Sequence, residues 1–175
     1  MRAMSPMSPM SPMSPAASDA GAPALAAQRL VEQRLAEQAL AEQVRDAMVA
    51  KDSVARLLGM QVDAVGPGTA SVSMPVRADM LNGFGICHGG LIATLADTAF
   101  AYACNSANQL TVASGFDIDL LAAVHGGDRL AAHCASVSQG ARMGLYDVVV
   151  RNQRDERVAM FRGRSYRLHG KPVIG

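Results

Sequence analysis

The sequence of 175 residues contains no tryptophan, and aromatic residues make up only 4% of it. Alanine, valine and leucine must therefore supply most of a hydrophobic core. Apolar residues nevertheless account for half of the chain, which excludes disorder of the whole chain. A chain of this length can form one domain with a buried core, with or without a tail.

Cysteine is also scarce. Cys87, Cys104 and Cys134 are too few and too widely separated for a disulfide framework. No CxxC motif and no cluster of histidine and cysteine indicates a zinc site, so we expect no metal. The absence of a disulfide scaffold favours a reducing cytoplasm as the location.

Long hydrophobic runs and a strong excess of one charge are both missing. The longest apolar stretch, Leu91–Cys104, contains Asp97 and is shorter than the roughly 20 residues of a membrane-spanning helix. No apolar segment follows Arg2, so we expect no secretory signal. The net charge of +1 excludes a globally basic nucleic-acid-binding protein. We therefore expect neither nucleic acid nor a membrane as a partner.

The first 50 residues differ in composition from the rest of the chain. Met4–Pro15 repeats Met-Ser-Pro four times, and proline at every third position removes backbone donors that helices and sheets need. We expect residues 1–22 to form a disordered tail. Residues 23–50 are rich in alanine, glutamate and glutamine, which predicts an N-terminal helical extension without a clean apolar stripe.

The remaining sequence predicts an α+β domain at residues 51–170, followed by a C-terminal tail at 171–175. One long helix is expected over Gly89–Asn105, which is rich in alanine and leucine. Six strands are expected at Met60–Val65, Thr69–Val76, Leu110–Leu121, Arg129–Ser138, Gly144–Asn152 and Val158–Leu168. A single helix can cover one face of an antiparallel sheet, so we expect the sheet to wrap around it.

Asp97 is the only ionisable residue between His88 and Tyr102 on the predicted helix. A carboxylate in such apolar surroundings is costly to bury unless it is hydrogen-bonded or paired, and desolvation raises its pKa and its basicity. Two interpretations stay open from the residues alone. Asp97 is either a catalytic base, or a structural residue that faces solvent or another subunit or bonds to Thr94 or Thr98.

The tripeptide His88-Gly89-Gly90 lies where a loop leads into the predicted helix. Free backbone N–H groups at such a helix start can polarise a carbonyl or bind an oxyanion, although an ordinary loop–helix junction has the same residues. Gly89 and Asp97 would lie about 12 Å apart along one helix. Antiparallel helices of a two-fold dimer could pair Gly89 of one chain with Asp97 of the other, which predicts a site shared across the dimer interface.

Charge is distributed unevenly along the chain. Residues 139–175 contain eight basic and three acidic residues. Arginine forks suit phosphate groups, although several of these arginines could simply solvate strand faces. No interleaved aromatic residues indicate base stacking, which argues against nucleic acid as the ligand.

Two segments carry a resemblance to a known family, NGFGICHGGLIATLADTAFAYACNS at 82–106 and RMGLYDVVVRNQRDERVAMFRGRS at 142–165. They resemble the phenylacetic acid degradation (PaaI-type) hotdog thioesterases, and the resemblance covers about 51–169. It implies a hotdog fold, in which an antiparallel sheet wraps a long helix, and a homodimer that commonly forms a homotetramer. It also implies hydrolysis of acyl-CoA thioesters, with (hydroxy)phenylacetyl-CoA as the first candidate. Coenzyme A is then part of the substrate, and no separate cofactor is expected.

The resemblance also implies roles for individual residues. Asp97 is the catalytic carboxylate, as general base or nucleophile, and Gly89 supplies the N–H that polarises the thioester carbonyl. Asn82 helps to hold the water or the carboxylate, and His88 orients the carbonyl or the thiolate. Further substrate contacts are implied for Gly90, Ser138, Gly140, Ala141, Arg142, Met143 and Arg167.

Two alternatives to this substrate and activity stay open. One is a hotdog thioesterase for other aromatic or medium-chain acyl-CoAs, and the other is a non-catalytic acyl-CoA-binding regulator. Asp97 argues against the regulator, because a sensor needs no charged residue at that position. Met80, Phe84 and Phe100 are candidates for the lining of the acyl pocket.

Overall fold

The computed structural model describes residues 21–175, so the Met-Ser-Pro repeat and most of the tail expected at 1–22 lie outside the described residues. Helix α1 (Gly21–Val49) includes the last two residues of that expected tail and the helical extension expected after it. The chain divides into two compact units at Gln33, and the second unit is Arg34–Gly175. Within the second unit, Ala41 and Val44 of α1 are buried, so this half of the helix is packed.

Helix α2 (Ser53–Leu58) is an element that the sequence pattern did not predict. The Asp52 carboxylate accepts a hydrogen bond from the Ala55 N–H at 2.9 Å, which caps the start of the helix. Gly59 ends it in a left-handed conformation with φ of 68°. These two residues are typical helix caps, but the helix is so short that its apolar periodicity is not visible.

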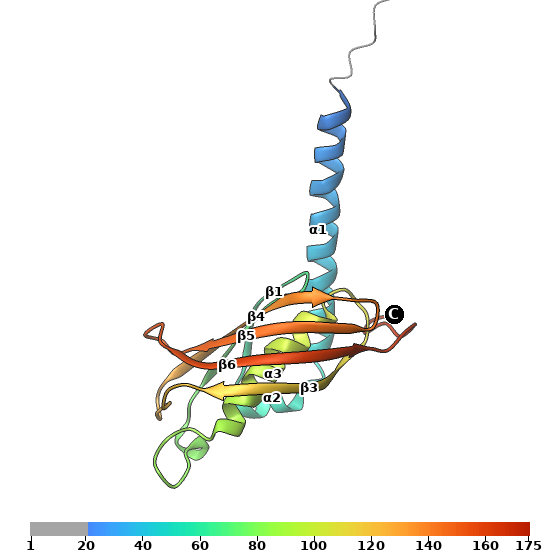
Figure 1. Ribbon diagram of the computed structural model, residues 1–175. Coiled ribbons are helices and arrows are strands. Elements are labelled where there is room, and N and C mark those ends of the chain that lie inside the picture. The colour runs from blue at the N-terminus through green and yellow to red at the C-terminus, as the bar shows by residue number, and fades with distance from the viewer. Residues whose placement is uncertain (1–20) are drawn as a thin grey trace, which may run out of the picture. The chain divides into compact units, whose positions relative to one another are not determined.

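The six expected strands form one antiparallel sheet with the order β1-β2-β4-β5-β6-β3 (Figure 1). Their bounds lie within one residue of the predicted ones: β1 Gln61–Gly66, β2 Thr69–Pro75, β3 Thr111–Leu120, β4 Arg129–Gln139, β5 Met143–Arg151 and β6 Arg157–Arg167. A short 3-10 helix, η1 (Ala78–Met80), lies in the loop before α3. Strands β1 and β3 are the edges of this sheet.

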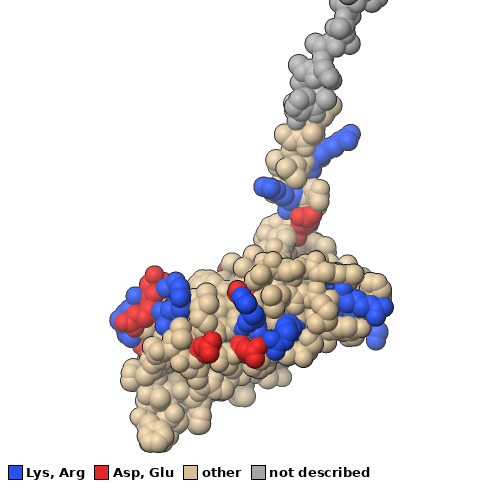
Figure 2. Space-filling model, viewed as in Figure 1, with Lys and Arg blue, Asp and Glu red and all other residues tan. Residues whose placement is uncertain are grey.

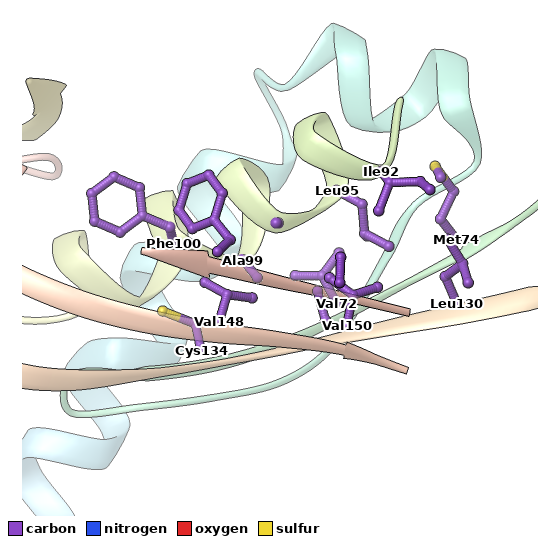
Figure 3. Packing of buried hydrophobic residues seen from close by; sticks show 14 of the residues in the cluster. Val72, Met74, Ile92, Leu95, Ala99, Phe100, Leu130, Cys134, Val148 and Val150 are labelled. Atoms are coloured by element: carbon purple, nitrogen blue, oxygen red, sulfur yellow. The ribbon is translucent and has the colours of Figure 1, made fainter. Parts of the chain in front are cut away.

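Helix α3 (Gly89–Asn105) has the predicted bounds and packs against the sheet. Figure 3 shows side chains of this helix, among them Leu95 and Phe100, directed towards residues of the strands. The Phe100 ring meets the Tyr146 ring edge to face at 5.3 Å, which compensates for the shortage of large side chains. The expected α+β class and its hotdog arrangement are confirmed. Within residues 21–175, no helix combines the length and hydropathy needed to span a membrane.

Helix α3 runs antiparallel to the edge strand β3. At the start of the helix, a Cβ added to Gly89 would lie only 2.4 Å from Cδ1 of Leu120, the last residue of β3. At the end of the helix, the Asn105 side chain accepts from the Thr111 N–H and donates to the Thr111 carbonyl, each at 2.9 Å. The two ends of α3 therefore lie beside opposite ends of the same edge strand.

Candidate active site

Asp97 is half-buried on α3 and faces a pocket of about 340 Å³. The pocket is lined mostly by apolar residues: Met48, Phe100, Ala101, Cys104, Asn105, Leu110, Thr111, Val112, Ala113 and Val173. Burial raises the pKa of the Asp97 carboxyl above that of an exposed aspartate. The pocket therefore combines one basic carboxylate with an apolar wall.

The threonines on either side of Asp97 have other partners. The Thr94 hydroxyl donates to the Gly90 carbonyl and the Thr98 hydroxyl to the Thr94 carbonyl, both at 2.8 Å. Both hydroxyls therefore donate to backbone carbonyls of the helix, and neither donates to the Asp97 carboxylate. The interpretation in which Asp97 bonds to Thr94 or Thr98 is therefore wrong.

The thiol in this pocket is not an activated nucleophile. Burial raises the pKa of Cys104 to about 12, and the nearby Asp97 charge acts in the same direction. A thiol with so high a pKa stays protonated at neutral pH. Cys104 therefore serves as part of the apolar wall.

The His88-Gly89-Gly90 segment forms the start of α3, as the sequence predicts. His88 is exposed and occupies the N-cap position without a side-chain capping bond. The first N–H groups of a helix have no partner in the preceding turn, and they lie at the positive end of the helix dipole. A Cβ at Gly90 would meet nothing within 4 Å, so this glycine faces open space.

Asn82 belongs to the loop that leads into α3. Its side-chain oxygen accepts hydrogen bonds from the Phe84 N–H at 2.9 Å and the Ile86 N–H at 3.4 Å. The loop continues to His88, whose N–H donates to the Met80 carbonyl at 3.0 Å. Asn82, His88 and Gly89 are thus brought together at one end of α3.

One chain does not bring these residues to Asp97. Gly89, which follows the loop, lies beside Leu120 at the end of β3, whereas the pocket of Asp97 contains Thr111 at the beginning of β3. Of the candidate pocket residues, Phe100 lines the Asp97 pocket, Met80 is buried in the core and Phe84 is 92% exposed on the loop.

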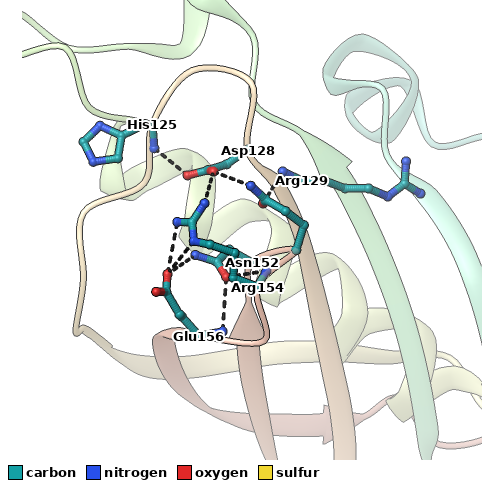
Figure 4. A network of polar contacts seen from close by, with 7 residues as sticks. His125, Asp128, Arg129, Asn152, Arg154 and Glu156 are labelled. Carbon is teal, nitrogen blue, oxygen red and sulfur yellow. Dashed lines mark hydrogen bonds and ion pairs between the residues drawn. The ribbon is translucent and has the colours of Figure 1, made fainter.

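A network of polar contacts around Asp128 braces the loop before α3 (Figure 4). The buried Asp128 carboxylate accepts from the His125 N–H at 2.8 Å and from Nε2 of Gln153 at 2.7 Å. It also forms an ion pair with Arg154 at 3.4 Å. His125 pairs with Ile86 in an antiparallel bridge, which links the network to the Asn82 loop.

The role of Asp128 was not expected from the sequence. The aspartate after two glycines is a usable signal, because short acidic side chains often bond to nearby backbone in turns. Arg154 likewise forms ion pairs with Asp128 and Glu156 rather than simply solvating a strand face.

The segment 138–143, for which substrate contacts are expected, lies at the end of the sheet that holds the Asp97 pocket. Ser138 belongs to β4, Gly140, Ala141 and Arg142 form the turn after it, and Met143 begins β5. The Arg167 N–H donates to the Arg142 carbonyl at 2.8 Å, and Arg167 pairs with Thr111 of the pocket.

Figure 2 shows how charge is distributed over this face. Acidic and basic side chains lie next to one another over the middle of this face. Ion pairs link neighbouring strands, Arg162 of β6 with Asp147 of β5 and Arg164 of β6 with Asp117 of β3. Basic side chains gather at the right-hand end in this view, the end of the sheet that carries the β4–β5 turn. Within residues 21–175, the buried Nε of Arg167 has no hydrogen-bond partner.

The sequence is similar to those of known thioesterases. The family model of the Thioesterase superfamily matches residues 84–159. The acyl-coenzyme A thioesterase PaaI of Escherichia coli (strain K12) is 46% identical over 124 residues, which cover 71% of this chain and 89% of that protein.

Solved structures give the same result. The E. coli PaaI protein from the phenylacetic acid degradation operon superposes with a TM-score of 0.75 at 44% identity, covering 77% of this chain and 97% of that one. A mutant of the phenylacetic acid degradation protein PaaI from Thermus thermophilus superposes with a TM-score of 0.65 at 36% identity, covering 67% and 100%. The similarity therefore extends over nearly the whole of each relative.

Proposed function

Because the chain belongs to the thioesterase superfamily as a PaaI-like acyl-CoA thioesterase, we propose that its substrate is an aromatic acyl-CoA, with (hydroxy)phenylacetyl-CoA as the first candidate. The reaction adds water to the thioester carbon, breaks the carbon–sulfur bond and releases the free acid and coenzyme A. The observation that carries the proposal is the half-buried Asp97 in its apolar pocket of about 340 Å³.

Asp97 is the catalytic carboxylate in this proposal. Its raised pKa makes it a stronger base than an exposed aspartate, so it can take a proton from the attacking water or attack the thioester itself. Gly89 donates its N–H to the thioester oxygen, where negative charge develops as the carbonyl is attacked. Asn82 and His88, next to Gly89, position the water and the thioester end.

The coenzyme A end of the substrate is held by the basic end of the sheet. Arg142 and Arg167 provide guanidinium groups for phosphate. Gly90 and the segment with Ser138, Gly140, Ala141 and Met143 lie along the remaining part of the substrate. The exposed backbone of this turn allows close approach of the ligand.

A homodimer completes the active site. β3 is an edge strand with exposed apolar side chains, Val112, Phe116 and Leu120, which favours pairing with the β3 strand of a second copy. Antiparallel pairing of two such strands places the Leu120 end of one chain at the Thr111 end of the other. Gly89 of one copy then lies near Asp97 of its partner. Within one copy these two residues are too far apart along α3 to act on one thioester.

We also propose the domain bounds, the assembly and the location of the protein. The catalytic domain corresponds to residues 51–170, with the helical extension at 23–50 before it and the short tail at 171–175 after it. We expect two dimers to associate into a homotetramer and the enzyme to act in the cytoplasm on a pathway of phenylacetate degradation.

The decisive experiment measures thiol release from a panel of acyl-CoAs with the full-length protein. The panel contains hydroxyphenylacetyl-, phenylacetyl-, benzoyl- and medium-chain acyl-CoAs. We expect the highest kcat/KM for the arylacetyl esters, and a loss of about 100- to 10,000-fold in Asp97→Asn, as for removal of a general base. Full turnover by folded Asp97→Asn would refute the assignment, and tight binding without hydrolysis by the wild type would favour a regulator.

A further inference from the structure

One side chain binds the last residues of the C-terminal segment beyond β6. Asn108, in the turn after α3, has a left-handed backbone with φ of 56°. Its side-chain oxygen accepts from the Val173 N–H at 3.0 Å and the Ile174 N–H at 2.9 Å, and its Nδ2 donates to the Ile174 carbonyl at 3.1 Å. One carboxamide therefore satisfies three backbone groups of the tail.

Backbone hydrogen bonds hold the preceding residues of this segment next to the pocket. The Leu110 N–H donates to the Lys171 carbonyl and the Leu168 N–H to the Leu110 carbonyl, both at 2.8 Å. Leu110 is itself a residue of the Asp97 pocket. The tail is thus hydrogen-bonded to Leu110, which directly precedes β3 and lines one side of that pocket.

The clamp places Val173, which is half-buried, in the wall of the Asp97 pocket, which Met48 and Val112 also line. Val173 is the only contribution of the tail to this wall among the described residues. It lies beyond residues 84–159, to which the family model extends. Its side chain has no polar group, so its influence on a substrate must come from the space that it fills.

We propose that Val173, held in place by Asn108, is a specificity-determining residue that limits the size of the acyl group in the Asp97 pocket. The inference rests on the proposed function, in which the thioester lies at Asp97 and the acyl group fills the apolar pocket. Val173 is not part of the hydrophobic core, so this part of the pocket wall can be altered without changing the core. Removing methyl groups from Val173 enlarges the pocket, and adding a ring reduces it.

The test compares kcat/KM across the acyl-CoA panel for Val173→Ala and Val173→Phe. One methylene in an apolar pocket changes kcat/KM by about 10- to 200-fold. We therefore expect at least about a tenfold change in the preference between bulky and small acyl groups, towards bulky for Val173→Ala and towards small for Val173→Phe.

Asn108 offers a matched pair of variants for the clamp. Asn108→Gly suits the left-handed backbone but removes all three hydrogen bonds, so it should shift the preference in the direction of Val173→Ala. Asn108→Asp keeps the acceptor for the two N–H groups and should stay closer to the wild type. Thermal unfolding identifies any variant that fails to fold.

The outcomes separate this inference from the proposed function. If Asp97→Asn is inactive but both folded Val173 variants keep the wild-type profile of acyl preference, the role of Val173 is refuted and the active site stands. If Asp97→Asn retains full turnover, the proposed function itself fails. A profile that shifts for Val173→Ala but not for Asn108→Gly would overturn the role of the clamp.

Discussion

At the scale of single residues, the two glycines that begin α3 differ in how closely other atoms approach them. A Cβ at Gly89 would lie 2.4 Å from Cδ1 of Leu120, whereas a Cβ at Gly90 would meet nothing within 4 Å. The first position therefore excludes a side chain unless Leu120 moves, and the second does not.

This contrast provides a prediction with its own control. Gly89→Ala should lower kcat strongly, because the new Cβ and the Leu120 side chain that must rotate away from it crowd the N–H that is proposed to polarise the carbonyl. Its melting temperature should change little, because the clashing atom is a terminal methyl of the exposed Leu120 side chain. Gly90→Ala should leave the melting temperature nearly unchanged. Steady-state kinetics and thermal unfolding of both variants check this, and equal effects of the two on kcat would show that the Leu120 contact is unimportant.

The raised pKa of Asp97 predicts that activity and stability change in opposite directions with pH. Catalysis needs the carboxylate, so kcat/KM should fall as the pH drops through a value above that of an exposed aspartate. Folding favours the neutral carboxyl, so Asp97 lowers the free energy of unfolding as the pH rises from the pKa of an unfolded aspartate through the higher folded-state pKa, and the full loss persists above it.

Asp97→Asn removes this charge. At neutral pH the variant should consequently be as stable as the wild type or more stable. Under acidic conditions, where the wild-type carboxyl is protonated, the variant should have no advantage in stability. Melting temperatures of both proteins as a function of pH provide the measurement. A lower melting temperature of the variant at pH 7 would mean that the carboxylate has a stabilising partner.

At the scale of elements, the turn before β4 supports the loop before α3 through Asp128. The hydrogen bond from the His125 backbone is the main reason that the pKa of Asp128 lies below its usual range, followed by that from Gln153. The stabilisation by this carboxylate is therefore present above the pKa of an unfolded aspartate and is lost as the pH falls through the lower folded-state pKa.

Asp128→Asn should weaken both the fold and the active site. The amide cannot accept all the hydrogen bonds of the carboxylate, and we expect a loss of about 1–3 kcal/mol in the free energy of unfolding at pH 7. The difference from the wild type should shrink in strong acid.

We also expect kcat of Asp128→Asn to fall more than KM rises, because the loop with Asn82 and the start of α3 shifts. Glu156→Gln is the control, since Glu156 contacts Arg154 and Asn152 but not the His125 turn. Denaturant unfolding and kinetics at a temperature where all variants are folded provide the test. A loss of stability with unchanged kcat would limit Asp128 to a structural role.

At the scale of the whole molecule, the proposed catalytic groups of one chain lie at opposite ends of β3. A shared site therefore predicts complementation between Asp97→Asn and Gly89→Ala chains. Random pairing makes half of the dimers mixed, each with one intact site, so the mixture should regain about a quarter of the wild-type activity. Coexpression with two affinity tags and native mass spectrometry identifies the mixed dimers. Mixed dimers no more active than the parent variants would place each site within one chain.

The secondary structure could be predicted where the pattern was long and uniform. The alanine- and leucine-rich run after His88-Gly89-Gly90 predicted α3 with its observed bounds, and the alternating runs predicted all six strands. Helix α2 did not show in the pattern, because six residues between Asp52 and Gly59 contain too few turns for apolar periodicity.

From the sequence alone, the fold class, the position of Asp97 on an apolar helix and the thioesterase family could be determined, because each depends on residues that are neighbours in the chain. The pocket around Asp97, its tail residue Val173 and the brace at Asp128 were decided only by the tertiary structure. The pocket combines α1, α3, β3 and the C-terminal segment, and the brace joins the turns at His125 and Gln153 to the loop before α3. Contacts between such distant segments follow from packing that no local pattern records.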